Sequence, residues 1–284
     1  LPLSKDMNLL QGKPYLNAPN EWLDALEYAG FDGLIMANNH ACDGGKTGII
    51  ETLEELDRRG IPHTGLYRSK QEKRYFTMER NGIKIGILSY AAYYNLKDKF
   101  LTGEEQDTML SRPIQNKMNA DVQALRKEGA EYIIAYSHSG TEYSHVPAAR
   151  QERYGAMLVQ AGVDYIVGSH PHVLQPYEPL RYRDTVTPYI YSMGNFTSSM
   201  LRSATKETLI LSLTLERDES GEVALAEQTY YPCYMLDEYE KEPFVLIPED
   251  KDCNGSLYEN APKALVNQLK DYFKHIRKIV GKLD

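Results

Sequence analysis

The stretch Gly129-Ala-Glu-Tyr-Ile-Ile-Ala-Tyr-Ser-His138 decides the fold class, because it links the end of a helix to a buried strand. Val122 and Leu125 have helical spacing just before this stretch, and Gly129 suits the left-handed backbone position that follows a helix. The run from Glu131 to Tyr136 is rich in β-branched and aromatic residues, which favours a strand. The stretch therefore predicts a helix, a glycine turn and a strand, in that order.

The same order of helix, glycine and strand occurs three more times along the chain. The helices end at Gly30, Gly60 and Gly162, and the strands after them are expected at residues 31–37, 61–64 and 163–167. Helices that alternate with apolar strands are typical of an α/β fold, in which helices cover the faces of a largely parallel sheet. We therefore predict a layered α/β fold with a largely parallel central sheet.

Two β-hairpins are expected to be added to this core. Asn81-Gly82, between residues 74–79 and 83–90, is a strong signal for a two-residue hairpin turn. Residues 208–216 and 223–230 have the composition of two further strands joined by a turn.

The C-terminal part of the chain has a different character. After Pro232 it becomes acidic and is expected to be loop-like through Asp252, and an apolar stripe predicts a helix over about 261–280. We divide the chain into a main domain, residues 1–235, and a C-terminal extension, residues 236–284, that packs on the same domain.

The composition argues against nucleic-acid binding and against a membrane-spanning helix in this sequence. The 284 residues include 32 Lys and Arg against 40 Asp and Glu, a net charge of −8 with no dense basic block. Nucleic-acid binding therefore has no electrostatic basis. The longest apolar stretches fall well short of the ~20 residues that a membrane-spanning helix needs.

Polar residues follow four of the predicted strands, at residues 38–43, 137–142, 168–172 and 192–195. Parallel α/β sheets bind ligands beyond the carboxyl ends of their strands, where loops converge. Four of the seven histidines, His40, His138, His170 and His172, lie in these segments. We expect these side chains to converge at one edge of the sheet.

Each of these signals also has a structural interpretation. A single histidine after a strand, such as His138, is more often structural than functional, and Asn39 beside His40 could simply cap a helix. The His170-Pro-His172 pair is stronger, because two imidazoles in an extended segment can bind one metal or two adjacent metals. The three segments together favour a metal site.

The motifs at these strand ends resemble those of a known family. They are Asn38-Asn39-His40-x-x-Asp43-x-Gly45, His138-x-Gly140-x-Glu142-Tyr143, Gly168-x-His170-Pro-His172-Val-Leu-Gln175 and Tyr191-Ser-x-Gly194-Asn195-Phe196. In order and spacing, over roughly residues 14–235, they resemble the CapA-type bacterial capsule synthesis proteins associated with poly-γ-glutamate. The resemblance implies a fold similar to that of the calcineurin-like metallophosphatases.

The resemblance also implies a two-metal site. Asn39, His138 and His170 would bind one ion, and His172 would bind the second. A mixed set of amide, imidazole and carboxylate ligands suits Mn, Fe or Zn. Two such ions activate a bridging water and stabilise the entering and leaving oxygens in phosphoryl transfer.

The remaining motif residues would support this chemistry. The resemblance implies that His40 is the catalytic general acid for the leaving group, with Asp43 beside it at the catalytic position. Asp43, Glu142 and Asn195 would orient histidines or bound water.

The chain departs from the family pattern at its start. Metallophosphatases also use an Asp motif from the first strand and a carboxylate after the second, and neither precedes the Asn-His motif here. We expect these strands, and a membrane anchor, to lie upstream of Leu1; the alternative is a protein that has lost half of its metal site.

Two functions agree with these residues. One is a metal-dependent hydrolase that acts on a phosphoester or on the polyanionic envelope polymer. The other is a non-catalytic subunit that binds or assembles the polymer together with membrane-bound capsule synthesis subunits. The family resemblance implies a location outside the cytoplasmic membrane.

Overall fold

The computed structural model describes residues 2–4, 15–239, 242–250, 258 and 261–283. The chain forms two compact units. The first unit contains residues 1–138 and 157–164, and the second contains residues 139–156 and 165–284.

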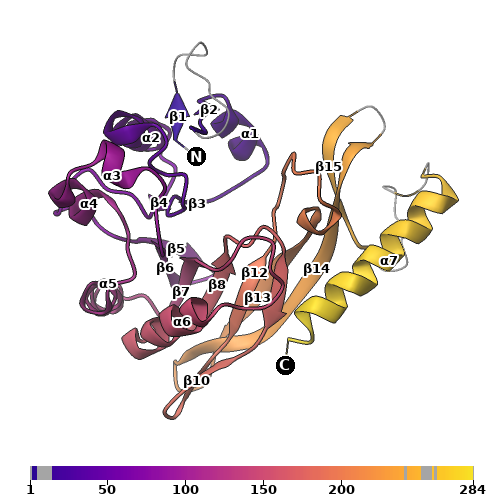
Figure 1. The fold of residues 1–284 in the computed structure, drawn as a ribbon. Helices are drawn as coiled ribbons and strands as arrows, with labels where there is room; N and C mark the ends of the chain where they lie inside the picture. The colour runs from indigo at the N-terminus through magenta and orange to yellow at the C-terminus, as the bar shows by residue number, and fades with distance from the viewer. Residues whose placement is uncertain (1, 5–14, 240–241, 251–257, 259–260, 284) are drawn as a thin grey trace. The chain divides into compact units, whose positions relative to one another are not determined.

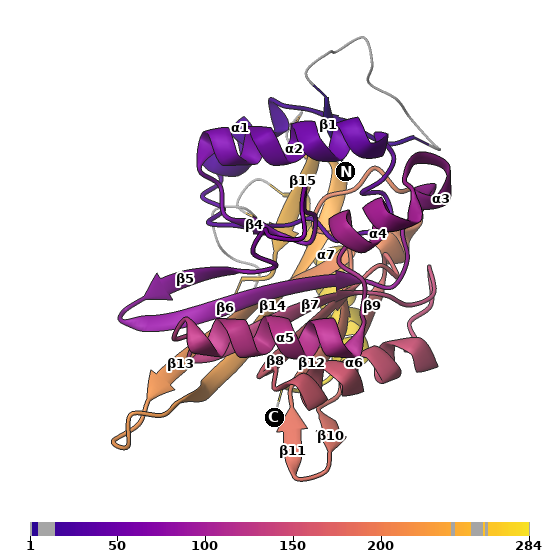
Figure 2. The ribbon, with the colours of Figure 1, turned by 90° about the vertical axis from the view of Figure 1, so that its left-hand side faces the viewer.

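The first unit combines helices with short and long strands. In chain order its elements are β1 (Leu3–Ser4), β2 (Ala18–Pro19), α1 (Trp22–Tyr28), β3 (Leu34–Ile35), α2 (Gly45–Arg59), β4 (His63–Thr64), β5 (Phe76–Arg80), β6 (Ile83–Ala91), α3 (Lys97–Phe100), α4 (Gly103–Met109), α5 (Gln115–Lys127) and β7 (Tyr132–His138). The pairs β1–β2, β3–β4 and β6–β7 are parallel, whereas β5 runs antiparallel to β6. Figure 2 shows β5 and β6 as a long hairpin.

The glycine turns that end the helices are as predicted. Gly30, Gly60, Gly129 and Gly162 have φ angles of 81°, 69°, 89° and 96°, in the left-handed region. At the end of α2, the amides of Gly60 and Ile61 donate to the carbonyls of Asp57 and Leu56, which closes the helix. The apolar face of α2, with Ile49, Leu53 and Leu56, is buried in the core of the unit.

The Asn81-Gly82 hairpin is also confirmed. Both residues have positive φ, 50° and 76°, which matches the turn type that suits the twist of a two-residue hairpin. Further along β6, Gly86 lies against Leu125 of α5. A Cβ at this position would lie 2.7 Å from Leu125 Cδ2, so a larger residue would not fit without a shift.

The second unit is built mainly of strands. Its elements are α6 (Ala149–Ala161, of which residues 149–156 belong here), β8 (Tyr165–Ser169), β9 (Leu174–Tyr177), β10 (Leu180–Tyr182), β11 (Thr185–Thr187), β12 (Tyr189–Met193), the 3-10 turn η2 (Ser203–Thr205), β13 (Glu207–Arg217), β14 (Val223–Tyr239), β15 (Glu242–Pro248) and α7 (Lys263–Val280). Strand β12 pairs in parallel with β8 and antiparallel with β9. Strands β13, β14 and β15 form an antiparallel sheet (Figure 1).

The predicted α/β fold, with added hairpins and a C-terminal helix, is therefore confirmed. The prediction of a loop after Pro232 is wrong, because β14 continues to Tyr239 and pairs with β15. Apolar residues within the acidic stretch explain the difference, since Tyr234 and Met235 lie opposite Ile247 and Leu246 and all but Leu246 are buried. The division of the chain into residues 1–235 and 236–284 stays a prediction.

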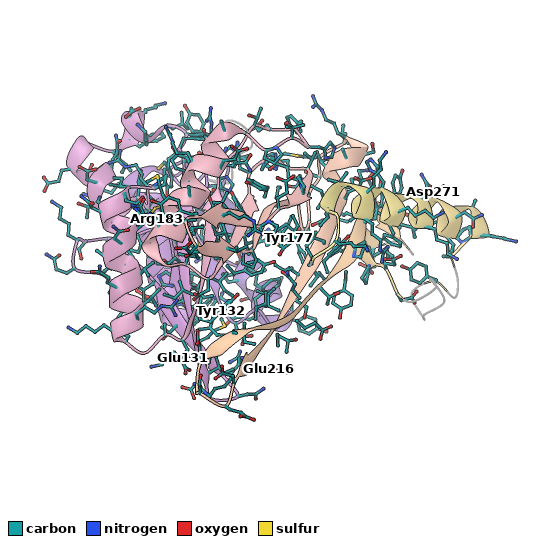
Figure 3. All side chains as sticks on the ribbon, turned by 90° about the horizontal axis from the view of Figure 1, so that it is seen from below. Glu131, Tyr132, Tyr177, Arg183, Glu216 and Asp271 are labelled. Atoms are coloured by element: carbon teal, nitrogen blue, oxygen red, sulfur yellow. The ribbon has the colours of Figure 1, made fainter. Side chains whose placement is uncertain are left out.

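The C-terminal helix α7 packs on strands of the second unit. Its buried residues Leu269, Phe273 and Ile276 face β9, β13 and β14. The Nδ1 atom of His275 lies 2.8 and 3.0 Å from the two carboxylate oxygens of Glu207, at the start of β13. Figure 3 marks Asp271 on this helix and Tyr177 on β9. Across the described ranges, no helix has both the length and the apolar character that crossing a bilayer requires.

The first unit contains a buried carboxylate. Asp121 on α5 accepts a hydrogen bond of 2.8 Å from the hydroxyl of Tyr90, and the Nε atom of Arg74 lies 3.9 Å away. Burial, the largest effect, raises the pKa of Asp121 to about 6, although Tyr90 and Arg74 oppose it.

This pKa predicts a pH-dependent stability. Because an unfolded aspartate has a pKa of ~3.9, the folded chain retains a proton that the unfolded chain has lost between about pH 4 and pH 6. The free energy of unfolding should fall as pH rises through this window, by at most roughly 3 kcal/mol. The variant Asp121→Asn should lose this decline in urea unfolding measured from pH 4 to pH 7. The exposed Asp271→Asn variant is the control, and a decline of the same size in Asp121→Asn and wild type would contradict the assignment.

Candidate functional site

Two sequence-predicted metal ligands meet in the first unit. Asn39 lies in the loop after β3 and His138 ends β7, and Asn39 Oδ1 is 3.1 Å from His138 Nε2. Both side chains belong to buried residues, with exposed fractions of 4% and 8%. The loop after β6 holds both backbones, because Ala92 donates its amide to the carbonyl of His138 and Asn95 donates to that of Asn39.

The spacing of these two atoms fits a shared metal ion. Ligand atoms about 2.0 to 2.2 Å from one ion, at tetrahedral to right angles, lie roughly 3 to 3.6 Å apart. An amide oxygen and an imidazole nitrogen are also a suitable donor pair for a transition metal. The arrangement of Asn39 and His138 is therefore compatible with metal binding.

The loop after β3, which carries Asn39, also places His40 against Asp43. His40 Nδ1 is 2.7 Å from Asp43 Oδ2, which also accepts a hydrogen bond of 2.8 Å from the amide of Leu16. The Asp43 side chain is fully buried, whereas that of His40 is 23% exposed. Asn38 shapes the turn by accepting from the His40 amide. With a proton held on Nδ1 by the carboxylate, Nε2 is the His40 atom that can exchange protons with a ligand.

The other two histidines lie on a strained turn in the second unit. His170 and His172 follow β8 with φ angles of 105° and 62°, and their ring centroids are 6.0 Å apart. Positive φ at a non-glycine residue costs of order 1 kcal/mol or more, and such strain persists only where the surroundings enforce it. The turn thus fixes two imidazoles close together at the carboxyl end of β8.

Asn195, in the loop after β12, sets the orientation of His172. Its Oδ1 atom is 2.9 Å from His172 Nδ1, while its Nδ2 donates to the carbonyl of Thr205 at 3.1 Å. Because the amide nitrogen is committed to Thr205, the amide oxygen faces His172 and accepts its Nδ1 proton. The lone pair of His172 is therefore on Nε2, the form that a metal ligand requires.

Glu142 is placed differently from these residues. It is exposed on the loop after β7, and within the part of the chain that the structure describes it makes no hydrogen bond with a histidine. Its predicted role in orienting histidine or water stays a prediction. Among the described residues, no group of three or more His, Cys, Asp or Glu side chains is arranged to hold a metal ion.

Two glutamines that were assigned no role hold the loop of Glu142 in place. Gln175 is fully buried, and its Nε2 donates to the carbonyls of Ser144 and Val146 at 2.9 and 3.2 Å. Gln151 on α6 donates to Gln175 Oε1 at 2.7 Å. The signal in the sequence is a glutamine inside the apolar run of β9, where an amide has to find buried partners.

The fold and these side-chain pairs define a mixed α/β protein that presents asparagine and histidine at strand ends. The chain belongs to the bacterial capsule synthesis protein family PGA_cap, whose family model matches residues 1–200. This match contains all four motifs and confirms the resemblance seen in the sequence, although it begins and ends earlier than residues 14–235.

Two curated relatives are named as capsule or PGA biosynthesis proteins. The chain is 29% identical over 203 residues to the capsule biosynthesis protein CapA of Bacillus anthracis, covering 71% of this chain and 48% of the relative. It is 29% identical over 209 residues to the PGA biosynthesis protein CapA of Bacillus subtilis (strain 168), covering 73% and 53%. The chain thus spans about half the length of the curated relatives it matches.

Two solved structures are similar at lower identity. The calcineurin-like phosphoesterase YfkN of Bacillus subtilis aligns with a TM-score of 0.49 and 17% identity, over 90% of this chain and 74% of that one. The sulfate thiohydrolase SoxB of Thermus thermophilus, in complex with glycerol, aligns with a TM-score of 0.46 and 15% identity, over 93% and 43%.

Removing the amide of Gln175 should loosen the loop that it holds. The variant Gln175→Leu leaves two carbonyls and the amide of Gln151 without this partner, which should cost about 1 to 3 kcal/mol. Urea unfolding should show this loss, and amide hydrogen exchange should become faster over residues 144–148. The exposed Gln268→Leu variant on α7 serves as the control; unchanged exchange in Gln175→Leu would show that the loop is held by other contacts.

Proposed function

We propose that this chain carries the catalytic part of a divalent-metal-dependent hydrolase that works in the synthesis of a capsule polymer. Membership of the PGA_cap family supports the setting. The observation that carries the chemistry is the 3.1 Å approach of Asn39 Oδ1 to His138 Nε2, which brings two metal-compatible donors together in a buried position. The proposed substrate is a phosphoester or the polyanionic polymer itself.

Each unit holds proposed ligands of its own. Asn39 and His138 would hold an ion in the first unit. In the second unit His170 and His172 are the proposed ligands, with Asn195 orienting His172. Such a donor set suits Mn, Fe or Zn. When bound, divalent ions lower the pKa of a coordinated water and stabilise negative charge on oxygen.

The proposed general acid is His40. Asp43 holds the Nδ1 proton of its ring, so that His40 Nε2 can deliver a proton to the leaving group. Because Asp43 is buried and also accepts from the amide of Leu16, the imidazole is positioned by a carboxylate that is itself fixed. This arrangement orients the acid without any contribution from a metal ion.

The names of the two relatives, both capsule or PGA biosynthesis proteins, support a place in the cell envelope. We extend this to an extracytoplasmic location, with an anchor to the membrane and an association with membrane-bound capsule synthesis subunits. Both extensions follow from the family resemblance and concern a whole protein, whereas the match with this chain covers about half of each curated relative.

Metal binding should depend on pH. Histidine binds a metal only in its neutral form, so affinity should fall as pH drops below the ordinary histidine pKa of ~6.5. Calorimetric titration with Mn²⁺ should show weaker binding at pH 5.5 than at pH 7.5, and His138→Ala should bind more weakly at both values. Equal affinity at the two pH values would argue against histidine ligands.

Removal of the proposed acid should separate catalysis from metal binding. The variant His40→Ala should lower the turnover of a chromogenic phosphodiester by about 10²-fold to 10⁴-fold while Mn²⁺ affinity stays close to that of wild type. His63→Ala is a matched control, since the contacts given for this histidine of the first unit are with the carbonyl of Ile61 and the carboxylate of Asp57, not with a proposed ligand. Wild-type protein that binds metal but shows no turnover would favour the non-catalytic assembly subunit.

A further inference from the structure

Arg202 is placed against an aromatic ring that is distant in sequence. Its Cζ atom lies 4.2 Å from the centroid of the Tyr143 ring. Arg202 is exposed, as is Leu201 before it, which is 88% exposed. Within the described ranges, no carboxylate forms an ion pair with Arg202, whereas Arg58, Arg59 and Arg68 each contact at least one. An exposed guanidinium can present its charge and its N–H donors to a ligand.

Tyr143 is held beside the candidate metal ligands. Its amide donates to the carbonyl of Pro171 at 2.7 Å, and its φ of 62° is another positive value at a non-glycine residue. The ring lies on that of His172, with centroids 6.1 Å apart and an interplanar angle of 29°. Since Asn195 fixes His172 from another side, the Tyr143 ring rests on an ordered support.

A guanidinium stacked in this way is suited to bind an oxyanion. A guanidinium on an aromatic face covers one side of its plane but leaves the N–H groups at its edge free to donate. These donors form a fork that fits the two oxygens of a carboxylate or a phosphate. The stacked contact also lowers the entropy that Arg202 would lose on binding, because the long side chain is already held in place.

We propose that Arg202, held on Tyr143 beside His172, binds an oxyanion group of the substrate. The inference rests on the proposed function, since it makes His172 part of the reactive site. The shared chemistry is a carboxylate or phosphate oxyanion, which a chain with a net charge of −8 attracts only at a local positive group such as this one.

Binding measurements on two ligands can test this role and identify the source of the oxyanion. Isothermal titration with a glutamate oligomer and with inorganic phosphate, each with and without Mn²⁺, is compared for wild type and Arg202→Gln. Loss of a charged hydrogen-bonding group should weaken binding by about tenfold to a hundredfold. An effect on the oligomer alone indicates a carboxylate, and an effect on phosphate alone indicates a phosphoryl group. Equal affinities in wild type and Arg202→Gln for both ligands, or no binding of either by wild type, would overturn the proposal.

Three further variants test whether oxyanion binding requires the Arg202 guanidinium in its stacked position on Tyr143, rather than any positive charge on the surface. Arg183→Gln is the matched control, because Arg183 is exposed in the same unit and lies 5.4 Å from the neighbouring Tyr182 ring (Figure 3 marks Arg183). It should bind both ligands as wild type does. Tyr143→Phe should also retain affinity, whereas Tyr143→Ala should weaken binding although the charge remains. If Tyr143→Ala binds normally, the ring does not position Arg202.

Mn²⁺ titration of the same variants keeps this proposal distinct from the proposed function. Arg202→Gln should bind Mn²⁺ as wild type does, because the contact of Arg202 is with the Tyr143 ring and a guanidinium is not a metal ligand. If wild type binds no Mn²⁺ but Arg202→Gln still weakens oxyanion binding, the metal-dependent function fails and the oxyanion site stands. If Mn²⁺ binds and oxyanion affinity does not depend on Arg202, the oxyanion site fails and the metal-dependent function stands.

Discussion

The parallel register of β6 and β7 is the constraint on which the first unit's candidate site depends. Ala91 lies opposite His138, so both strands end together and the loop after β6 begins where His138 stands. That loop then donates amides from Ala92 to His138 and from Asn95 to Asn39. Because neighbouring residues of a strand face opposite sides, a shift of one residue in this register would turn His138 away from Asn39. The apolar runs that fill both strands therefore also position the buried donor pair.

In the second unit the site depends on local strain rather than on register. His170, His172 and Tyr143 all adopt positive φ, although none of them is glycine. Two of these residues are held by hydrogen bonds that they donate, His172 to Asn195 and Tyr143 to the carbonyl of Pro171. Gly168 explains part of the geometry, because a Cβ there would lie only 2.0 Å from the carbonyl oxygen of Tyr191. The close approach of β8 to β12 fixes where the strained turn begins.

Local patterns in the sequence predicted the elements that local chemistry controls. The glycine turns, the Asn81-Gly82 hairpin and the C-terminal helix follow from backbone preferences and spacing within a few residues. The extension of β14 was missed because its pairing partner, β15, is itself part of the acidic stretch. The contact of Arg202 with Tyr143 was equally inaccessible, since nothing near Arg202 in sequence signals a distant aromatic ring. The sequence singled out Asn39, His138, His172 and Asn195 as candidate site residues, and their roles stay a prediction. The contacts of Asn39 with His138 and of His172 with Asn195 required the three-dimensional structure.

The contact between His275 and Glu207 has a consequence for how the C-terminal helix can be altered. Glu207 lies two positions after Thr205, whose carbonyl accepts from the amide of Asn195. Burial raises the pKa of Glu207, and the neighbouring imidazole of His275 counteracts this effect. Helix α7 and the loop that orients His172 are thus fastened to the same three-residue segment. A shortened form of the protein that lacks this helix would leave a buried carboxylate without its imidazole, next to the segment that aligns Asn195.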